Sequence, residues 1–221
     1  MLWRCVSICR RGRTTLSVES RAWRYEIGLL SLTLVALMVS GMKPYDRLTW
    51  WLEVAPVLLV IPVLWLTRER FSLTRLLYTL IFVHALILIL GGHYTYARVP
   101  LGFWVQDWLE LSRNNYDRLG HVAQGFIPAM AAREILLRCT PLAAGKMLFF
   151  LVTCTALAIS AFYELIEWWA AALLGGSAEE FLALQGDVWD TQWDMFMALC
   201  GALGAQWLLG RWHDRLLARV G

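Results

Sequence analysis

A carboxylate, an imidazole and an amide share one predicted helix face in the second half of the chain. Asp117 and His121 are four positions apart, and Gln124 follows three positions later, which is the spacing of neighbours on an α-helix. A histidine oriented by a carboxylate can act as a general base, and the same pair can also bind a metal ion. The simpler interpretation is an aspartate that caps a helix beside a packed histidine.

Carboxylates recur at two more places downstream. Glu164 and Glu167 lie three positions apart inside an apolar stretch, where two like charges repel unless a cation or a shared proton lies between them. Asp187, Asp190 and Asp194 then fall on one face of a later helix, and three aspartates exceed what helix capping requires. An oxygen-rich set with one histidine suits Mg²⁺, Mn²⁺ or Ca²⁺, and Zn²⁺ is also open.

These spacings predict either a cation-binding or catalytic cluster or a metal-free polar network. The expected catalytic residues are Asp117, His121 and Glu164. The expected ligands of a divalent cation are Glu164, Glu167, Asp187, Asp190 and Asp194. Supporting positions are expected at Gln124, Gln185 and His93, the last because it ends an apolar segment at the same predicted depth.

The segments that must position these residues are those of a membrane protein. Of the 221 residues, 59% are hydrophobic and 17% are charged, whereas soluble domains carry about a quarter charged residues. Six segments approach the roughly 20 apolar residues that cross a bilayer as a helix. They are residues 27–42, 48–66, 76–96, 119–137, 147–173 and 192–209. We therefore predict an all-α polytopic membrane helix bundle with about six transmembrane helices.

The basic residues predict how this bundle is oriented. With both termini in the cytoplasm, only five of the 20 Lys and Arg residues fall in outward-facing stretches, in line with the positive-inside rule. These five are Lys43, Arg47, Arg98, Arg113 and Arg118. In this topology every acidic motif described above lies near the outer membrane face, where a buried carboxylate needs a partner, a water-filled cavity or a metal.

Outside the predicted spans the chain has only short tails. Residues 1–24 are expected to form a basic cytoplasmic tail, residues 25–210 a single transmembrane domain, and residues 211–221 a second basic tail. A transit peptide has a similar Arg-rich and Ser-rich bias and is the alternative for residues 1–24. The five cysteines lie in predicted spans or on the cytoplasmic side, so no disulfide framework is expected. No basic tract interleaved with aromatic residues indicates nucleic-acid binding.

Three motifs together resemble one bacterial family. They are Asp117-Arg118-Leu119-Gly120-His121 with Gly125, Tyr163-Glu164-Leu165-Ile166-Glu167-Trp168, and Gln185-Gly186-Asp187 with Asp190 and Asp194. Over about residues 24–210 they are similar to the YjdF-type family of bacterial inner-membrane proteins, which has no established activity. The order of acids is also similar, more loosely, to VanZ-like membrane proteins of the cell envelope. Those proteins usually carry an Arg and an Asn where this chain has extra aspartates.

Three classes of function use such a cluster. The leading hypothesis is metal-assisted hydrolysis or group transfer on a lipid or lipid-linked envelope substrate at the outer membrane face. The chain has no Gly-x-Ser-x-Gly or His-Glu-x-x-His motif. A cation- or proton-coupled transporter would use the same acids, but it is expected to carry charges in both membrane halves. A non-catalytic binding or structural subunit would present the acids to a partner protein.

Overall fold

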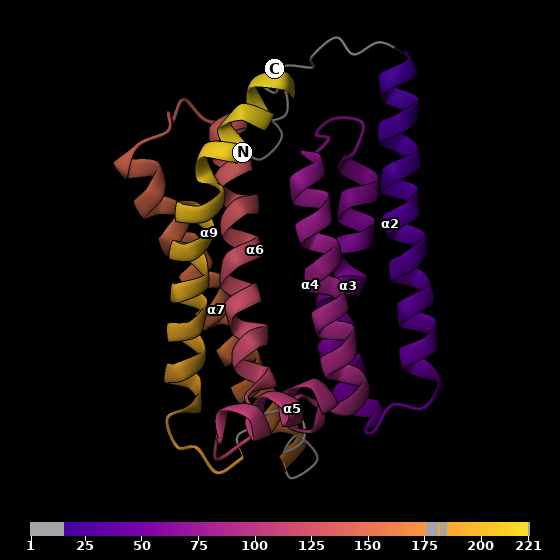
Figure 1. The fold of residues 1–221 in the computed structure, drawn as a ribbon, viewed down its shortest axis with the longest axis vertical. Helices are drawn as coiled ribbons and strands as arrows, with labels where there is room; N and C mark the ends of the chain where they lie inside the picture. Colours follow the sequence, from indigo (N-terminus) through magenta and orange to yellow (C-terminus); the bar gives the residue numbers. More distant parts are fainter. Residues whose placement is uncertain (1–15, 176–180, 182–184, 221) are drawn as a thin grey trace.

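The computed structural model describes residues 16–175, 181 and 185–220, and the regular structure in this part of the chain is entirely helical (Figure 1). The prediction of an all-α fold is therefore confirmed. In chain order the elements are α2 (Leu16–Met42), α3 (Arg47–Thr67), α4 (Arg75–Tyr94), the 3-10 turn η1 (Tyr96–Arg98), α5 (Pro100–Leu109), α6 (Tyr116–Cys139), α7 (Lys146–Leu174) and α9 (Asp190–Val220).

Four described helices are long and apolar enough to cross a membrane. They are Trp23–Met42 within α2, and all of α3, α4 and α7. Helices α6 and α9 have the length, at 24 and 31 residues, but are less apolar. The packing explains the low hydropathy of α6, because this helix contacts α4, α7 and α9. Its polar residues Asp117, Arg133 and Glu134 are buried in protein, so they lower the hydropathy without facing lipid.

The long helices form two groups that lie side by side in Figure 1, with α2, α3 and α4 in one and α6, α7 and α9 in the other. Helix α4 joins them because it contributes to both apolar cores. Its Ile89 packs in the core that contains Leu37 of α2, and its Leu77 packs in the core that contains Met130 of α6 and Val152 of α7. Helix α2 begins and α9 ends at one end of the bundle, and α5 lies at the other, which we call the α5 end.

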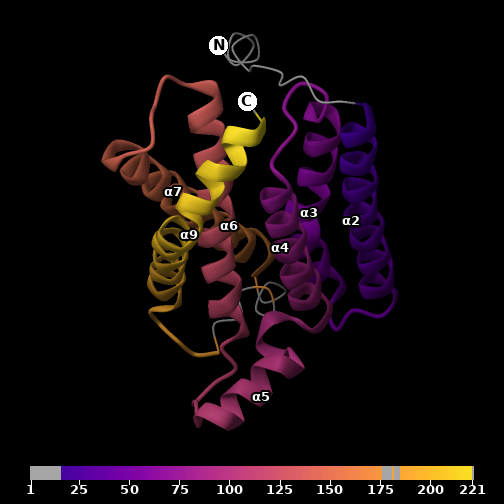
Figure 2. The same ribbon diagram turned by 45° about the horizontal axis from the view of Figure 1, so that its top comes forward.

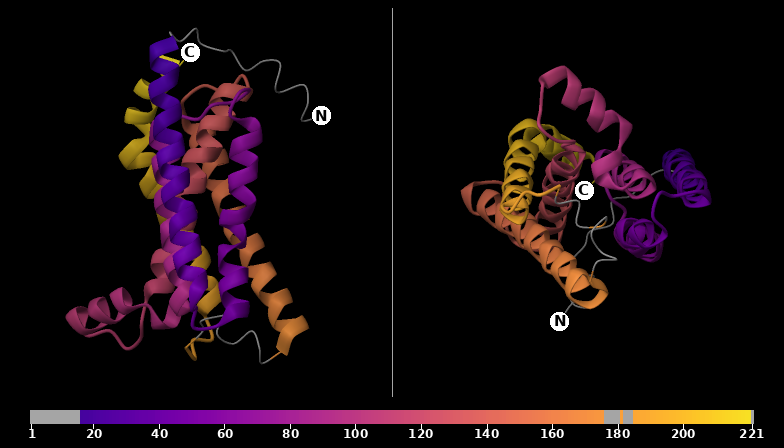
Figure 3. Two further views of the ribbon diagram at one scale, coloured as in Figure 1. Left: turned by 90° about the vertical axis from the view of Figure 1, so that its right-hand side faces the viewer. Right: turned by 90° about the horizontal axis from the view of Figure 1, so that it is seen from below.

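Helix α5 projects sideways from the bundle (Figures 2 and 3). Its two tryptophans are strongly exposed, Trp104 at 70% and Trp108 at 81%. Leu101, Val105 and Leu109 lie on the same helical face and are also exposed. An exposed helix with an apolar face of this kind matches the interface between lipid headgroups and acyl chains.

Glycines allow α6 and α9 to approach closely just beneath the acidic motifs. A Cβ atom on Gly125 would lie 1.8 Å from the carbonyl oxygen of Ala198. On the facing helix, a Cβ atom on Gly201 would lie 2.1 Å from the carbonyl oxygen of Val122. Small residues at helix contacts are the usual route to such close packing in membranes. The contact sets the separation of the side chains one turn away on both helices.

A buried polar network joins α4, α6 and α9 at the end opposite α5. The Glu134 carboxylate accepts hydrogen bonds from Thr74 N at 2.9 Å and Thr74 Oγ1 at 2.7 Å, and from Arg138 at 2.8 Å. His213 Nε2 lies 3.0 Å from Glu134, and His213 Nδ1 lies 2.9 Å from Arg133 Nη1. Since a guanidinium only donates, Nδ1 accepts and Nε2–H donates to Glu134. Glu134 and His213 are 0% and 1% exposed.

Candidate functional site

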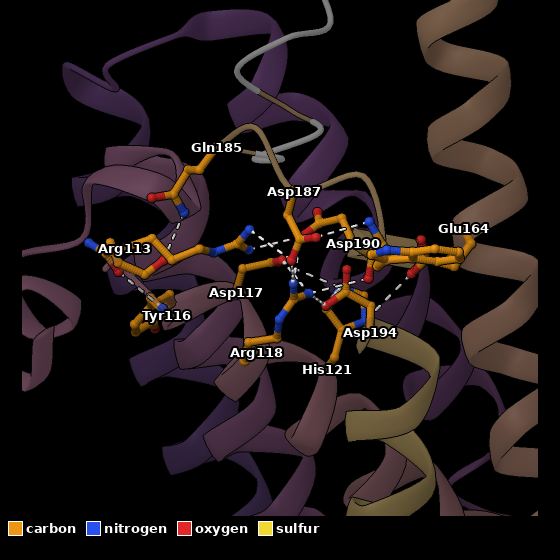
Figure 4. Close-up of polar contacts among 12 residues, drawn as sticks. Arg113, Tyr116, Asp117, Arg118, His121, Glu164, Gln185, Asp187, Asp190 and Asp194 are labelled. Carbon is orange, nitrogen blue, oxygen red and sulfur yellow. Dashed lines mark hydrogen bonds and ion pairs between the residues drawn. The ribbon is translucent and has the colours of Figure 1, made fainter. Parts of the chain in front are cut away.

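The candidate site lies at the α5 end, where α6 and α9 begin and α7 nears its end (Figure 4). Short polar side chains shape both helix starts, as is usual for Asn and Asp before a helix. Tyr116 N donates to Asn114 Oδ1 at 3.0 Å, and Trp189 N donates to Asp187 Oδ1 at 2.9 Å. Gln185 Nε2 donates to the Asn114 carbonyl at 2.8 Å. Gln185 therefore links the loop before α9 to the loop before α6.

Two arginines neutralise the aspartates at the start of α9. Arg118 Nη2 lies 3.1 Å from Asp187 Oδ2 and 2.6 Å from Asp190 Oδ1. Its Nη1 also contacts Asp194. Arg113 lies 2.8 Å from Asp190 and 3.4 Å from Asp187. Figure 4 shows Arg118 surrounded by these carboxylates. Asp187 and Asp190, expected from the sequence as metal ligands, are thus arginine partners here.

His121 is the centre of the remaining carboxylates. Its Nε2 lies 3.5 Å from Asp117 Oδ1 and 3.7 Å from Asp194 Oδ1. Its Nδ1 lies 2.9 Å from Gln124 Oε1 and 3.8 Å from Glu164 Oε1. Because the amide oxygen accepts, Nδ1 carries the proton in the neutral ring and the Nε2 lone pair faces the two aspartates. The predicted face of Asp117, His121 and Gln124 is therefore formed, with Gln124 orienting the imidazole.

Among the described residues, two overlapping groups have ligand atoms close enough to share a cation. In each group the atoms lie within 4.8 Å of one another; the groups are Asp117, His121 and Asp194, and His121, Glu164 and Glu167. The first group matches the His121 geometry better, since it uses the free Nε2 lone pair while Gln124 holds Nδ1–H. A metal-binding histidine usually donates its other ring N–H to an acceptor that fixes the orientation of the ring.

The Glu164 carboxylate is incompletely satisfied although it is buried. Glu164 is only 7% exposed. Its Oε1 has no hydrogen-bond partner among the described residues. This atom is the one that faces His121 at 3.8 Å. A buried, unpartnered carboxylate oxygen is costly and commonly marks a ligand, proton or water position.

Glu53 of α3 extends this polar region into the other helix group. It is 4% exposed, as expected for a residue that faces protein. The Tyr163 hydroxyl of α7 lies 3.5 Å from Glu53 Oε2, and Tyr96 also hydrogen-bonds to this carboxylate. Glu53 was not among the predicted site residues, although an acid one turn inside an apolar span is a recognisable signal.

His93 is not brought into the cluster. Its Nδ1 lies 2.8 Å from the carbonyl oxygen of Ser40, so its contact is with α2. The residues that the structure does bring together are Asp117, His121, Gln124, Glu164, Glu167, Asp187, Asp190 and Asp194. The site also contains three residues that the sequence analysis did not assign to it: Arg113, Arg118 and Glu53.

Comparison with known proteins identifies the family. The family model described as "Predicted membrane protein (DUF2238)" matches residues 25–215. The chain belongs to this family. It is 58% identical over 192 residues to "Inner membrane protein YjdF" of Escherichia coli (strain K12), which covers 87% of this chain and 91% of that protein. No solved structure matches the chain. The predicted YjdF-type membership is confirmed, and the chain is an inner-membrane protein.

The DUF2238 match includes both polar regions of the bundle. Residues 25–215 contain the Asp117–His121 cluster at the α5 end and also Glu134 and His213 at the opposite end. The family description names a membrane protein and no reaction, so the chemistry must be argued from the side chains.

Proposed function

We propose that this protein is a metal-dependent enzyme of the inner membrane that hydrolyses, or transfers a group from, a lipid or lipid-linked envelope substrate. One observation carries the proposal: His121 Nε2 faces Asp117 and Asp194, beside Oε1 of buried Glu164, which has no hydrogen-bond partner among the described residues. A structural network would satisfy that oxygen. Two carboxylates and one imidazole suit Mn²⁺ or Zn²⁺, with Mg²⁺ and Ca²⁺ as further candidates.

Each group has a distinct role in this chemistry. A cation on Asp117, His121 and Asp194 would keep open positions, as catalytic metal sites do, and would polarise a phosphoryl or carbonyl oxygen. Glu164 Oε1 accepts a proton from the attacking water or hydroxyl as the attacking oxygen bonds to the phosphorus or carbonyl carbon of the substrate. The leaving oxygen departs with its bonding pair and takes the proton back from Glu164. Gln124 keeps the imidazole oriented, and Glu167 completes the alternative ligand group.

The proposal also places the site at the extracytoplasmic face, in a bundle of six spans with both termini in the cytoplasm. Helix α2 begins and α9 ends at the same end, which requires an even number of crossings. Few of the 20 basic residues belong to the α5 end. The exposed Trp104 and Trp108 of α5 suit the outer headgroup layer. They would lead a lipid substrate towards the site.

Single cysteines in a cysteine-free variant test this topology. A membrane-impermeant thiol reagent added to intact cells is expected to label a cysteine replacing Asp107, which is exposed on α5. It is expected not to label a cysteine replacing Glu69, whose side chain is 78% exposed between α3 and α4. The opposite labelling pattern would place the candidate site in the cytoplasm and remove an envelope substrate from consideration.

Metal content tests the proposed function directly. The full chain, purified in mild detergent and dialysed against Mn²⁺, Zn²⁺, Mg²⁺ or Ca²⁺, is expected to retain about one cation per chain in the best case. Asp117→Asn should lose it, because the substitution removes an anionic ligand while keeping the side-chain shape. Asp107→Asn, an exposed aspartate on α5, should retain it. A wild-type protein that retains none of the four cations would contradict the proposal.

A cation- or proton-coupled transporter is the second candidate, and one observation favours it. The buried Glu134 and His213 place ionisable groups at the opposite end from His121, as expected for a path that crosses the membrane. Proton or cation flux into proteoliposomes that Glu134→Gln abolishes would favour this function over an enzyme. A protein that binds a cation but carries no flux supports the enzyme.

A further inference from the structure

A pocket of about 390 Å³ opens at the α5 end beside the cation ligands. This volume is within the usual range of small-molecule sites, roughly 300–1,000 Å³. Two guanidinium groups, Arg113 and Arg118, and one carboxylate, Asp187, supply its charged lining. Trp193 and Met197 supply its apolar lining. The lining therefore combines two guanidinium groups with an apolar wall, which fits an anionic group attached to a hydrophobic chain.

Arg118 connects this pocket with the candidate cation site. It lines the pocket, and it also contacts Asp194, whose Oδ1 lies 3.7 Å from His121 Nε2. A cation on Asp194 and the Arg118 guanidinium compete for the same carboxylate oxygen. When the cation takes that oxygen, the Arg118 donors lose a strong acceptor and become available to a ligand in the pocket.

The chemistry of the guanidinium identifies that ligand. A guanidinium presents paired N–H donors that match a phosphate as well as a carboxylate. Arg113 supplies a second such group from the loop before α6, at present bound to Asp190 at 2.8 Å. A cationic ligand would face two guanidiniums against one carboxylate and is disfavoured. Once a cation neutralises Asp194, Arg118 can exchange that carboxylate for a phosphate oxygen while Asp187 and Asp190 keep their contacts with Arg113.

Resting on the proposed function, we infer that the pocket binds a phosphate group of the substrate, and that Arg118 couples this binding to cation binding at Asp117, His121 and Asp194. The cation and the phosphate promote each other's binding, because each removes a competitor of the other. Linkage requires the effect to be equal in both directions. The phosphate belongs either to a lipid headgroup or to a soluble phosphate ester.

Cation affinity measured with and without phosphate tests the coupling. Mn²⁺ is titrated into the full-length protein in maltoside detergent, which carries no phosphate, and free Mn²⁺ is followed by electron paramagnetic resonance. Inorganic phosphate or short-chain phosphatidic acid is expected to tighten Mn²⁺ binding by roughly 5–150-fold, the usual range of coupling between sites. Chloride at equal ionic strength is expected to have no effect. If only phosphatidic acid tightens Mn²⁺ binding, the pocket binds the phosphate of a lipid headgroup. If inorganic phosphate also tightens it, the pocket recognises the phosphate group without the lipid.

Arginine variants separate coupling from simple chelation. Arg113→Gln is expected to bind Mn²⁺ normally without phosphate and to lose the enhancement, since Arg113 pairs with Asp187 and Asp190, which are not among the proposed cation ligands. Arg47→Gln, an exposed arginine at the start of α3, should keep the enhancement. Mn²⁺ binding that phosphate does not alter, or an enhancement that survives both Arg113→Gln and Arg118→Gln, would overturn the coupling and leave the cation site standing. Absence of Mn²⁺ binding in every condition, if Zn²⁺, Mg²⁺ and Ca²⁺ also fail to bind, would overturn the proposed function itself.

Discussion

Replacing Glu134 by alanine is expected to destabilise the protein by about 3–5 kcal/mol, the usual cost of removing one member of a buried ionic pair. The carboxylate is 0% exposed and accepts from Thr74, Arg138 and His213. Its removal takes this acceptor away from the Thr74 amide and from His213 in a site that water does not reach. Thermal unfolding in mild detergent measures the effect. At about 2–4 °C per kcal/mol for a chain of this size, Tm should fall by roughly 10 °C.

Two comparisons make the Glu134 result specific. Glu69→Ala removes a glutamate whose side chain is 78% exposed and is expected to leave Tm unchanged. His213→Ala should also destabilise, and the double variant should lose less than the sum of the single losses because both residues belong to one network. If the Tm of Glu134→Ala equals that of Glu69→Ala, the network does not hold α4, α6 and α9 together.

The helices themselves were largely predictable because their signals are local. The predicted spans 48–66 and 147–173 lie within α3 and α7, which run from Arg47 to Thr67 and from Lys146 to Leu174. Asp46, directly before the helix, caps α3 by accepting from Thr49 N at 2.7 Å. Apolar length and capping residues are properties of contiguous sequence. The predicted span 27–42 also lies within α2, although that helix begins earlier, at Leu16.

The candidate site was predictable where residues share a helix and less so where helices must meet. Asp117 and His121 were paired correctly by their spacing, and the structure gives a distance of 3.5 Å between Oδ1 and Nε2. The pairing of Arg118 with Asp190, 72 positions away, depends on how α6 packs on α9. Spacing carries no information about that packing. For the same reason the sequence placed His93 near the site by depth alone, whereas its contact is with Ser40.

The low hydropathy of α6 has the same physical origin as both polar regions. This helix contacts α4, α7 and α9, so it carries Asp117 and His121 near one end and Arg133 and Glu134 near the other without exposing them to lipid. A helix that is shielded by its neighbours can hold more charged residues than a helix that faces lipid. The least apolar long helices of the bundle are therefore also those that carry most of the candidate site.

Replacing Gly125 by alanine is expected to weaken both the fold and cation binding. The new Cβ would lie 1.8 Å from the Ala198 carbonyl oxygen, and because a backbone atom cannot swing aside, α6 and α9 must separate at a cost of about 1–3 kcal/mol. Gly125 follows His121 by one turn and Ala198 follows Asp194 by one turn. The separation therefore widens the 3.7 Å gap between Nε2 and Oδ1.

The matched substitution on α9 should change stability in the opposite direction. A Cβ on Gly204 meets nothing within 4 Å, so Gly204→Ala is expected to leave cation affinity unchanged and to raise stability by up to about 1 kcal/mol through helix propensity. Thermal unfolding and Mn²⁺ titration of the two variants measure both effects. If Gly125→Ala lowers Tm while Mn²⁺ affinity stays at the wild-type value, the cation does not bridge α6 and α9. The ligand group of His121, Glu164 and Glu167 would then be the better assignment.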